Sequence, residues 1–283
     1  MAGNKIEDVE TRFSPALAMR YSAAEHDVLA DAFNRDSLVV LRRHFEPEVL
    51  RAWRREFEPL LQANMREEQD NPNRGPQRFY VTLPFRGVFA DPAVYEDPDV
   101  LAIVERVVGP DPVMCQLATD TPLRGSDFQG WHADTPLLFP ETGDNDTPSF
   151  QIAVNFPLVD VTDENGPLET TYGTHRMNKA EVMERIAAGR IESRRETMAL
   201  GDVMIRDVRA VHRGTPNGTD EPRPMVVIGY SRRWLHRPEV SIRVPRSTWD
   251  GMSERGRRLV RFNPVVADDE ATPAVESYRA FAY

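Results

Sequence analysis

The sequence predicts a mainly β protein, in which a helical N-terminal part precedes a double-sheet jelly roll. Two observations support this prediction. From residue 113 onward, short runs of β-type residues alternate with turn-forming residues. Before that point, apolar residues recur at helical spacing. The chain has 283 residues, of which 40% are hydrophobic and 28% charged, which is enough apolar material for one sizeable core.

Helix signals dominate the first 110 residues, where residues 37–41 form a short strand-like run. Ser22 and Glu25 are spaced as a capping box, in which each side chain pairs with the backbone of the other. Two further helices are expected to begin at Pro47 and Pro98, because proline suits the first helical turn. The helix from Pro47 carries apolar residues on one face: Leu50, Trp53, Phe57, Leu60 and Leu61.

The β part is expected to contain about eight strands, and the clearest runs are 113–118, 129–138, 150–159, 167–172, 202–206 and 224–230. In Ile152, Val154, Phe156 and Leu158 the apolar period is two, which places the alternate residues on the opposite face. One helix, capped by Asn178, interrupts the strands, and a last one begins near Ser247. The predicted fold is a double-stranded β-helix, or cupin-like jelly roll, with flanking α-helices.

We expect one domain over residues 1–283, with three parts. These are a mainly helical lead-in and lid (1–110), the jelly-roll core (111–235) and a C-terminal extension (236–283). The segment 69–78 is polar and rich in helix breakers, and aromatic residues follow it up to Phe89. This region is either a lid over the active site or part of the core, and burial of its rings is the simpler alternative.

Composition excludes several classes of partner. The net charge of −10 argues against nucleic acid, and the absence of an 18-residue apolar run argues against a membrane-spanning helix. Cys115 is the single cysteine, so no intrachain disulfide forms, and it is expected to be a small core residue. The N-terminal residues do not resemble a secretory signal. We therefore expect a cytoplasmic protein.

A metal site is indicated by three residues in two short segments. In a strand, residues i and i+2 point the same way, so His132 and Asp134 would present an imidazole and a carboxylate to one face. His212 follows 80 residues later, at the predicted end of the strand that begins at Gly201. Two histidines and one carboxylate are the facial triad of non-haem Fe(II) oxygenases, which leaves coordination positions open for a co-substrate and O₂.

A His-x-Asp pair on its own is common by chance, and a strand histidine is more often a core or surface residue. Arg223 strengthens the metal hypothesis. It stands eleven residues after His212, beyond the turn-forming stretch 215–222, and a hairpin there would return it alongside His212. An arginine beside an open metal position offers a fixed fork for the distal carboxylate of a dicarboxylate.

These motifs resemble the phytanoyl-CoA dioxygenase family of Fe(II)/2-oxoglutarate oxygenases. The resemblance covers roughly residues 30–235 and rests on the two metal motifs, on the turn Asp163-Glu-Asn-Gly-Pro-Leu168 with Gly173-Thr-His-Arg176, and on Arg223-Pro. It implies that His132, Asp134 and His212 bind Fe(II), and that Arg223 pairs with the co-substrate 2-oxoglutarate. Gln116 and Asn155 match positions that contact the co-substrate, although Asn155 replaces a frequent tryptophan.

The resemblance also bears on the reaction. Relatives that halogenate usually replace the carboxylate ligand with alanine or glycine, so the presence of Asp134 disfavours halogenation. Hydroxylation of a small-molecule metabolite, with release of succinate and CO₂, is the expected activity, and desaturation and cyclisation start from the same chemistry. The sequence selects neither a substrate nor an oligomeric state.

Two alternatives from other classes stay open. One is a cupin-type metalloenzyme that uses another metal and no oxo acid, and the other is a catalytically silent jelly-roll binding module. The remaining histidines carry less weight. His26 and His44 are expected at the surface, His175 in a structural role, and His236 within a local basic patch.

Overall fold

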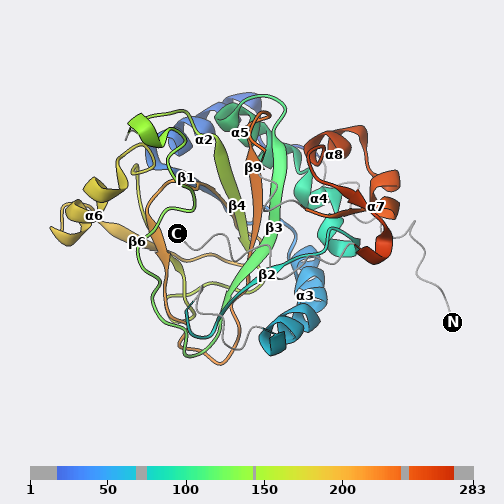
Figure 1. Cartoon of the computed structure of the whole chain (residues 1–283), viewed down its shortest axis with the longest axis horizontal. Helices are drawn as coiled ribbons and strands as arrows, with labels where there is room; N and C mark the ends of the chain where they lie inside the picture. The colour runs from blue at the N-terminus through green and yellow to red at the C-terminus, as the bar shows by residue number, and fades with distance from the viewer. Residues whose placement is uncertain (1–17, 68–74, 143–144, 237–241, 271–283) are drawn as a thin grey trace.

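Two antiparallel sheets form the centre of the protein, as the sequence predicts (Figure 1). The computed structural model describes residues 18–67, 75–142, 145–236 and 242–270. The larger sheet has the order β1 (Leu38–Leu41), β7 (Val203–Asp207), β4 (Gln151–Pro157), β9 (Met225–Ser231), β3 (Val113–Pro122) and β2 (Arg78–Thr82). The smaller sheet has the order β6 (Ser193–Glu196), β5 (Leu168–Thr171) and β8 (His212–Gly214).

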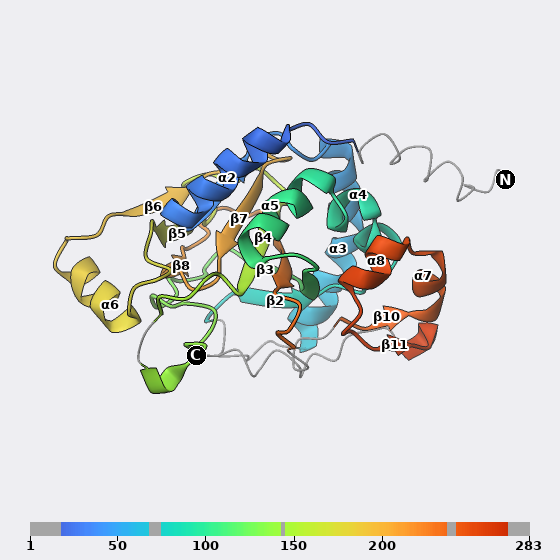
Figure 2. The ribbon, with the colours of Figure 1, turned by 90° about the horizontal axis from the view of Figure 1, so that it is seen from above.

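Helices flank the sheets, and two peripheral groups lie at opposite ends of the molecule (Figures 1 and 2). At one end is α6 (Lys179–Ala187), and at the other are α7 (Arg246–Gly251) and α8 (Glu254–Leu259) with the short parallel pair β10 (Val244–Pro245) and β11 (Val265–Val266). The remaining helices are α2 (Ala23–Asp36), α3 (Pro47–Glu67), α4 (Pro92–Tyr95) and α5 (Pro98–Val108). Within the described ranges, no helix combines the length and apolarity needed to cross a membrane.

One face of the larger sheet packs in the hydrophobic core and the other lines a cavity, and β4 shows this difference most clearly. Ile152, Val154 and Phe156 lie in the main hydrophobic core, together with side chains of α2, α3 and α5. The alternate residues Gln151, Ala153 and Asn155 line a cavity on the other face. The predicted period of two is therefore confirmed, and it separates a core face from a cavity face.

Most predicted elements are present, including the capping box at Ser22 and the helix capped by Asn178. The predicted strand 129–138 is wrong, because this segment is a loop in which His132 makes one isolated bridge to His212. Its partner β8 is only three residues long and so offers little for a strand to pair with. His212 is also not at the end of β7. The larger-sheet strand ends at Asp207, and the chain turns before His212 enters the smaller sheet.

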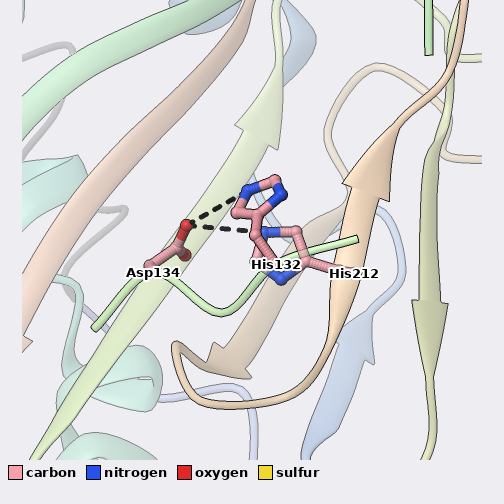
Figure 3. A group of neighbouring side chains, drawn as sticks. All are labelled: His132, Asp134 and His212. Atoms are coloured by element: carbon pink, nitrogen blue, oxygen red, sulfur yellow. Dashed lines mark ion pairs between the residues drawn. The ribbon is translucent and has the colours of Figure 1, made fainter. Parts of the chain in front are cut away.

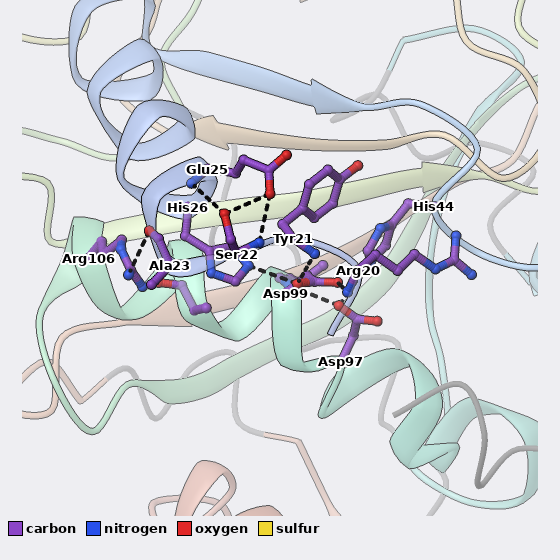
Figure 4. A network of polar contacts seen from close by, with 12 residues as sticks. Arg20, Tyr21, Ser22, Ala23, Glu25, His26, His44, Asp97, Asp99 and Arg106 are labelled. Carbon is purple, nitrogen blue, oxygen red and sulfur yellow. Dashed lines mark hydrogen bonds and ion pairs between the residues drawn. The ribbon is translucent and has the colours of Figure 1, made fainter. Parts of the chain in front are cut away.

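The surface positions predicted for His26 and His44 are wrong, because both side chains are buried. Figure 4 shows them paired with carboxylates near the N-terminus of α5: His26 Nε2 lies 2.8 Å from Asp99 Oδ1, and His44 Nε2 lies 2.9 Å from Asp97 Oδ1. The same carboxylates accept backbone N–H groups of Val100, Arg20 and Tyr21. The cluster therefore attaches the N-terminal segment to α5, a role that sequence spacing alone does not reveal.

The aromatic residues that follow the breaker-rich segment are mainly core residues. Phe79, Phe85 and Phe89 are buried in the main hydrophobic core, while Tyr80 lines the cavity. Residues 69–74, which belong to the proposed lid, lie outside the described residues. Cys115 is buried, as expected.

Asp91 gives the fold a testable pH dependence. It caps α4 and is buried, and this burial raises the pKa of its carboxyl from 3.8 to about 6. Stability from the protonated carboxyl is fully present below about pH 4 and is lost as the pH rises through 6. Asp91→Asn, which keeps a capping oxygen, should raise the free energy of unfolding relative to the native chain by up to ~3 kcal/mol at pH 8 and by much less at pH 4.

Urea unfolding at both pH values measures this difference, with the exposed Asp250→Asn as the control. An Asp91→Asn effect of the same size at pH 4 and pH 8 would contradict the assignment.

Candidate metal centre

The loop that carries His132 and Asp134 is attached to β8 by backbone hydrogen bonds. The N–H of His132 donates to the carbonyl of His212, and the N–H of His212 donates to the carbonyl of His132, both at 2.9 Å. Gln129 and Gly214 continue this attachment, because Gln129 N–H donates to Gly214 O at 3.0 Å and Gly214 N–H donates to Gln129 Oε1 at 2.9 Å. Side chains of the two segments are thereby brought to one place without a regular strand.

The turn between β7 and β8 positions the other half of the cluster. Asp207 and Arg209 are buried and form a two-pronged ion pair, with Nε–Oδ1 and Nη2–Oδ2 distances of 2.9 and 2.8 Å. This turn presents two carbonyls to the cluster. Val208 O accepts the N–H of Asp134 at 2.8 Å, and Ala210 O lies 2.9 Å from His212 Nδ1. One ion-paired turn thus fixes both Asp134 and the ring of His212.

The three side chains converge with their metal-binding atoms together (Figure 3). His132 Nδ1 lies 2.8 Å from the carbonyl of Gly130, and His212 Nδ1 is placed in the same way against Ala210. A carbonyl only accepts, so each Nδ1 carries a proton, and in a neutral ring this leaves the lone pair on Nε2. Both Nε2 atoms face Asp134 Oδ1, at 3.7 Å from His132 and 3.4 Å from His212.

This donor set fits a metal ion. The Nε2–Oδ1 separations are longer than an ordinary hydrogen bond, and a cation bound between two neutral rings and the carboxylate would attract all three groups. A Nδ1–H bonded to a backbone carbonyl is also the usual support of a metal-binding histidine. All three ligand atoms lie within 4.8 Å of one another, so a single ion can contact them all.

The electrostatics keep these groups in the protonation states that a metal requires. Burial is the largest effect that lowers the pKa of His132 to about 4, and the neighbouring His212 acts in the same direction. For Asp134, burial alone would raise the pKa. The charge of Arg206 is the largest effect that outweighs it, and the pKa of Asp134 lies well below its usual range. His132 is therefore neutral and Asp134 ionised at pH 7.

The cluster lines a cavity of about 400 Å³, a volume suited to small molecules. Gln116 and Asn155, the two predicted co-substrate contacts, both line it. Gln116 donates to the hydroxyl of Tyr80, and Asn155 donates to Val226 O at 3.1 Å. The cavity is thus bounded by the larger sheet, the loop that carries His132 and Asp134, and β8.

Arg223 lines the same cavity and is 3% exposed. Asn217 shapes the loop that precedes it, by donating to Pro122 O and Glu221 O, and Arg223 N–H donates to Pro122 O. Asp120 Oδ2 lies 4.0 Å from Arg223 Nη2 and 2.9 Å from Nη1 of the buried Arg78. Two buried guanidinium groups therefore share one carboxylate. Burial lowers the pKa of Arg223 to about 10, so it remains cationic at pH 7.

Two further arginines, which no sequence motif identifies, support this site. Arg206 donates to Asp134 Oδ2 at 2.7 Å, and Arg78 donates to Thr215 O at 2.8 Å. Neither belongs to a motif, and each lies far from its partner along the chain. An arginine within the apolar run 203–208 is the one local signal that could have drawn attention to Arg206.

A jelly roll that gathers two histidines and one carboxylate on a small-molecule cavity defines the class of mononuclear non-haem metal enzymes. The chain belongs to the phytanoyl-CoA dioxygenase (PhyH) family, whose model matches residues 33–225. This family uses Fe(II), 2-oxoglutarate and O₂, in agreement with the expected cofactors.

Three solved structures illustrate the similarity of fold. The non-haem α-ketoglutarate-dependent epimerase SnoN from nogalamycin biosynthesis matches with a TM-score of 0.59 at 19% identity, over 75% of this chain and 84% of SnoN. AviO1 from Streptomyces viridochromogenes Tue57 matches with a TM-score of 0.59 at 20% identity, over 75% of this chain and 97% of AviO1. The α-ketoglutarate-dependent carbocyclase SnoK matches with a TM-score of 0.55 at 15% identity, over 76% of this chain and 87% of SnoK.

Gly214 offers a test of how the site is assembled. A Cβ at this position would lie 2.5 Å from Arg78 Nη1 and 2.7 Å from Gln129 Oε1, so both side chains would have to move. Gly214→Ala should lower the free energy of unfolding by ~1–3 kcal/mol and weaken metal binding, because it disturbs the attachment between the loop and β8.

Gly130→Ala is the matched control, because a Cβ there meets nothing within 4 Å although it is two residues from His132. Denaturant unfolding and Co(II) titration of both variants measure the effect. Equal behaviour of the two variants would contradict the proposed assembly.

Proposed function

We propose that the chain is an Fe(II)/2-oxoglutarate-dependent oxygenase in which His132, Asp134 and His212 bind the iron and Arg223 binds the distal carboxylate of 2-oxoglutarate. The observation that supports this most is the convergence of two histidine Nε2 atoms on one oxygen of Asp134, while each Nδ1 lies against a backbone carbonyl. Three protein ligands leave coordination positions for the co-substrate and O₂. Family membership supports the same cofactors.

The charge near Arg223 supports a dianionic co-substrate. Arg78 and Arg223 are buried and lie near the single carboxylate of Asp120, so this group of three has a net charge of plus one. A buried guanidinium is stable when an anion pairs with it. The distal carboxylate of 2-oxoglutarate supplies that anion, while the other end of the molecule is left to reach the metal.

The remaining residues of the chain orient the reactants and exclude water. When bound, Fe(II), 2-oxoglutarate and O₂ together supply an oxidation in which 2-oxoglutarate becomes succinate and CO₂. Gln116, Tyr80 and Asn155 line the cavity beside the metal ligands, and Phe128 and Trp131 line it from the loop. The guanidinium of Arg213 lies over both of these rings, at 4.4 Å from each centroid, and stiffens this wall.

Hydroxylation of a small-molecule metabolite is the proposed reaction. The carboxylate of Asp134 fills the position that a halide would need, so halogenation is disfavoured. The fold neighbours SnoN and SnoK are named an epimerase and a carbocyclase, so other outcomes of the same oxidation are the relevant alternatives. Product mass separates them: hydroxylation adds one oxygen atom, cyclisation removes two hydrogens, and epimerisation leaves the mass unchanged.

Anaerobic titration of the purified chain with Fe(II) and 2-oxoglutarate tests the iron site. A weak visible charge-transfer band should appear only when both are present, because it requires the 2-oxo acid to chelate the iron. Asp134→Ala and His212→Ala should each abolish the band. A folded native chain that binds Fe(II) but gives no band would favour an enzyme without an oxo acid, and one that binds no Fe(II) would favour the silent module.

Arg223→Ala tests the co-substrate site separately. The apparent dissociation constant for 2-oxoglutarate in the same titration should rise at least ~10-fold, which corresponds to about 1.4 kcal/mol, while Fe(II) binding remains. Arg124→Ala is the control, because Arg124 is an exposed arginine paired with Asp220. Unchanged 2-oxoglutarate affinity in folded Arg223→Ala would refute this role for Arg223.

A further inference from the structure

Arg206 connects the carboxylate of Asp134 to the middle of the larger sheet. On one side, Arg206 Nη2 donates to Asp134 Oδ2 at 2.7 Å. On the other, Arg206 Nε donates to Asn155 Oδ1 at 3.1 Å, and Asn155 Nδ2 donates to Val226 O at 3.1 Å. These four residues thus form a continuous hydrogen-bonded series from Val226 in β9, through Asn155 in β4 and Arg206 in β7, to Asp134.

Because of this hydrogen-bonded series, the two carboxylate oxygens of Asp134 have different contacts. Oδ2 accepts the hydrogen bond from Arg206, whereas Oδ1 faces Nε2 of His132 and Nε2 of His212. A charged hydrogen bond at one oxygen holds the carboxylate plane in a fixed orientation. Only the other oxygen is then directed at the point where the two imidazoles converge.

The fold alone does not account for an arginine at this position. Every residue of β7 is buried, and the Arg206 side chain is 10% exposed. Its Nη1 is buried and has no hydrogen-bond acceptor among the described residues. Burial of a guanidinium with one nitrogen unsatisfied opposes folding, and an apolar side chain would avoid this cost. The contact between Arg206 and Asp134 therefore explains why an arginine stands at this buried position.

We propose that Arg206, held by Asn155, is a positioning residue that keeps Asp134 a one-oxygen metal ligand, an inference that rests on the function proposed above. If the second oxygen of Asp134 also turned to the metal, it would occupy a coordination position that the co-substrate or O₂ requires. The proposal also assigns a task to Asn155 that differs from direct contact with 2-oxoglutarate.

Co(II) titration of the metal-free protein, followed by visible absorption, tests this role without turnover. Arg206→Met should weaken Co(II) binding by ~10–100-fold, as loss of a hydrogen-bonding partner of a metal ligand does. It should also change the spectrum of bound Co(II), because the coordination by Asp134 changes. Arg206→Lys should recover part of the affinity, since its ammonium keeps a donor for Oδ2, and Asn155→Ala should weaken binding by a smaller factor.

Arg195→Met, the same substitution at an exposed arginine of β6, is the control and should bind Co(II) as the native chain does. Arg206→Met that binds Co(II) within about twofold of the native chain, with the same spectrum, overturns the proposal. If Arg206→Met does not fold, as judged by circular dichroism, Asn155→Ala decides: weaker Co(II) binding supports the proposal, and binding within about twofold of the native chain with the same spectrum overturns it. Failure of the native chain itself to bind Co(II) overturns the proposed iron site, and this inference with it.

Discussion

The site depends on the exchange of backbone hydrogen bonds between His132 and His212. Each residue donates to the carbonyl of the other at 2.9 Å, which places two distant segments in register at one point. The ring centroids are consequently 4.5 Å apart, and their Nε2 atoms are directed at the same carboxylate oxygen. Because the two backbones fix this pairing, the three candidate ligands are held together by the fold itself.

The rest of the molecule holds this point in place from several directions. The buried pair Asp207–Arg209 fixes the turn before His212, and Arg206 fixes the carboxylate of Asp134 from the larger sheet. The charged side chains of the site form two separate groups. Arg206 neutralises the ligand carboxylate, whereas Arg78 and Arg223 gather near Asp120 with one positive charge left over. One cavity can therefore offer a metal at one position and an anion-binding arginine at another.

Local patterns predicted much of the fold and the residue types of the site. Helix caps at Ser22 and Asn178 and the alternation in β4 depend on neighbours in the chain, so they could be inferred from the sequence. The loop around His132 was wrongly expected to be a strand, because its backbone is ordered by long-range bonds to β8 and to Val208. The buried pairs of His26 and His44, and the partners of Arg206, are also tertiary. No local sequence pattern indicates which distant carboxylate an isolated histidine or arginine pairs with.

Anomalous X-ray diffraction at the iron edge, from crystals grown anaerobically with Fe(II) and 2-oxoglutarate, tests the central claim most directly. We expect one anomalous peak about 2 Å from Nε2 of His132, Nε2 of His212 and Oδ1 of Asp134. We also expect Asp134 Oδ2 to stay on Arg206, with the distal carboxylate of 2-oxoglutarate on Arg223. An iron peak at any other position, or one that lacks either histidine, would refute the proposed iron site.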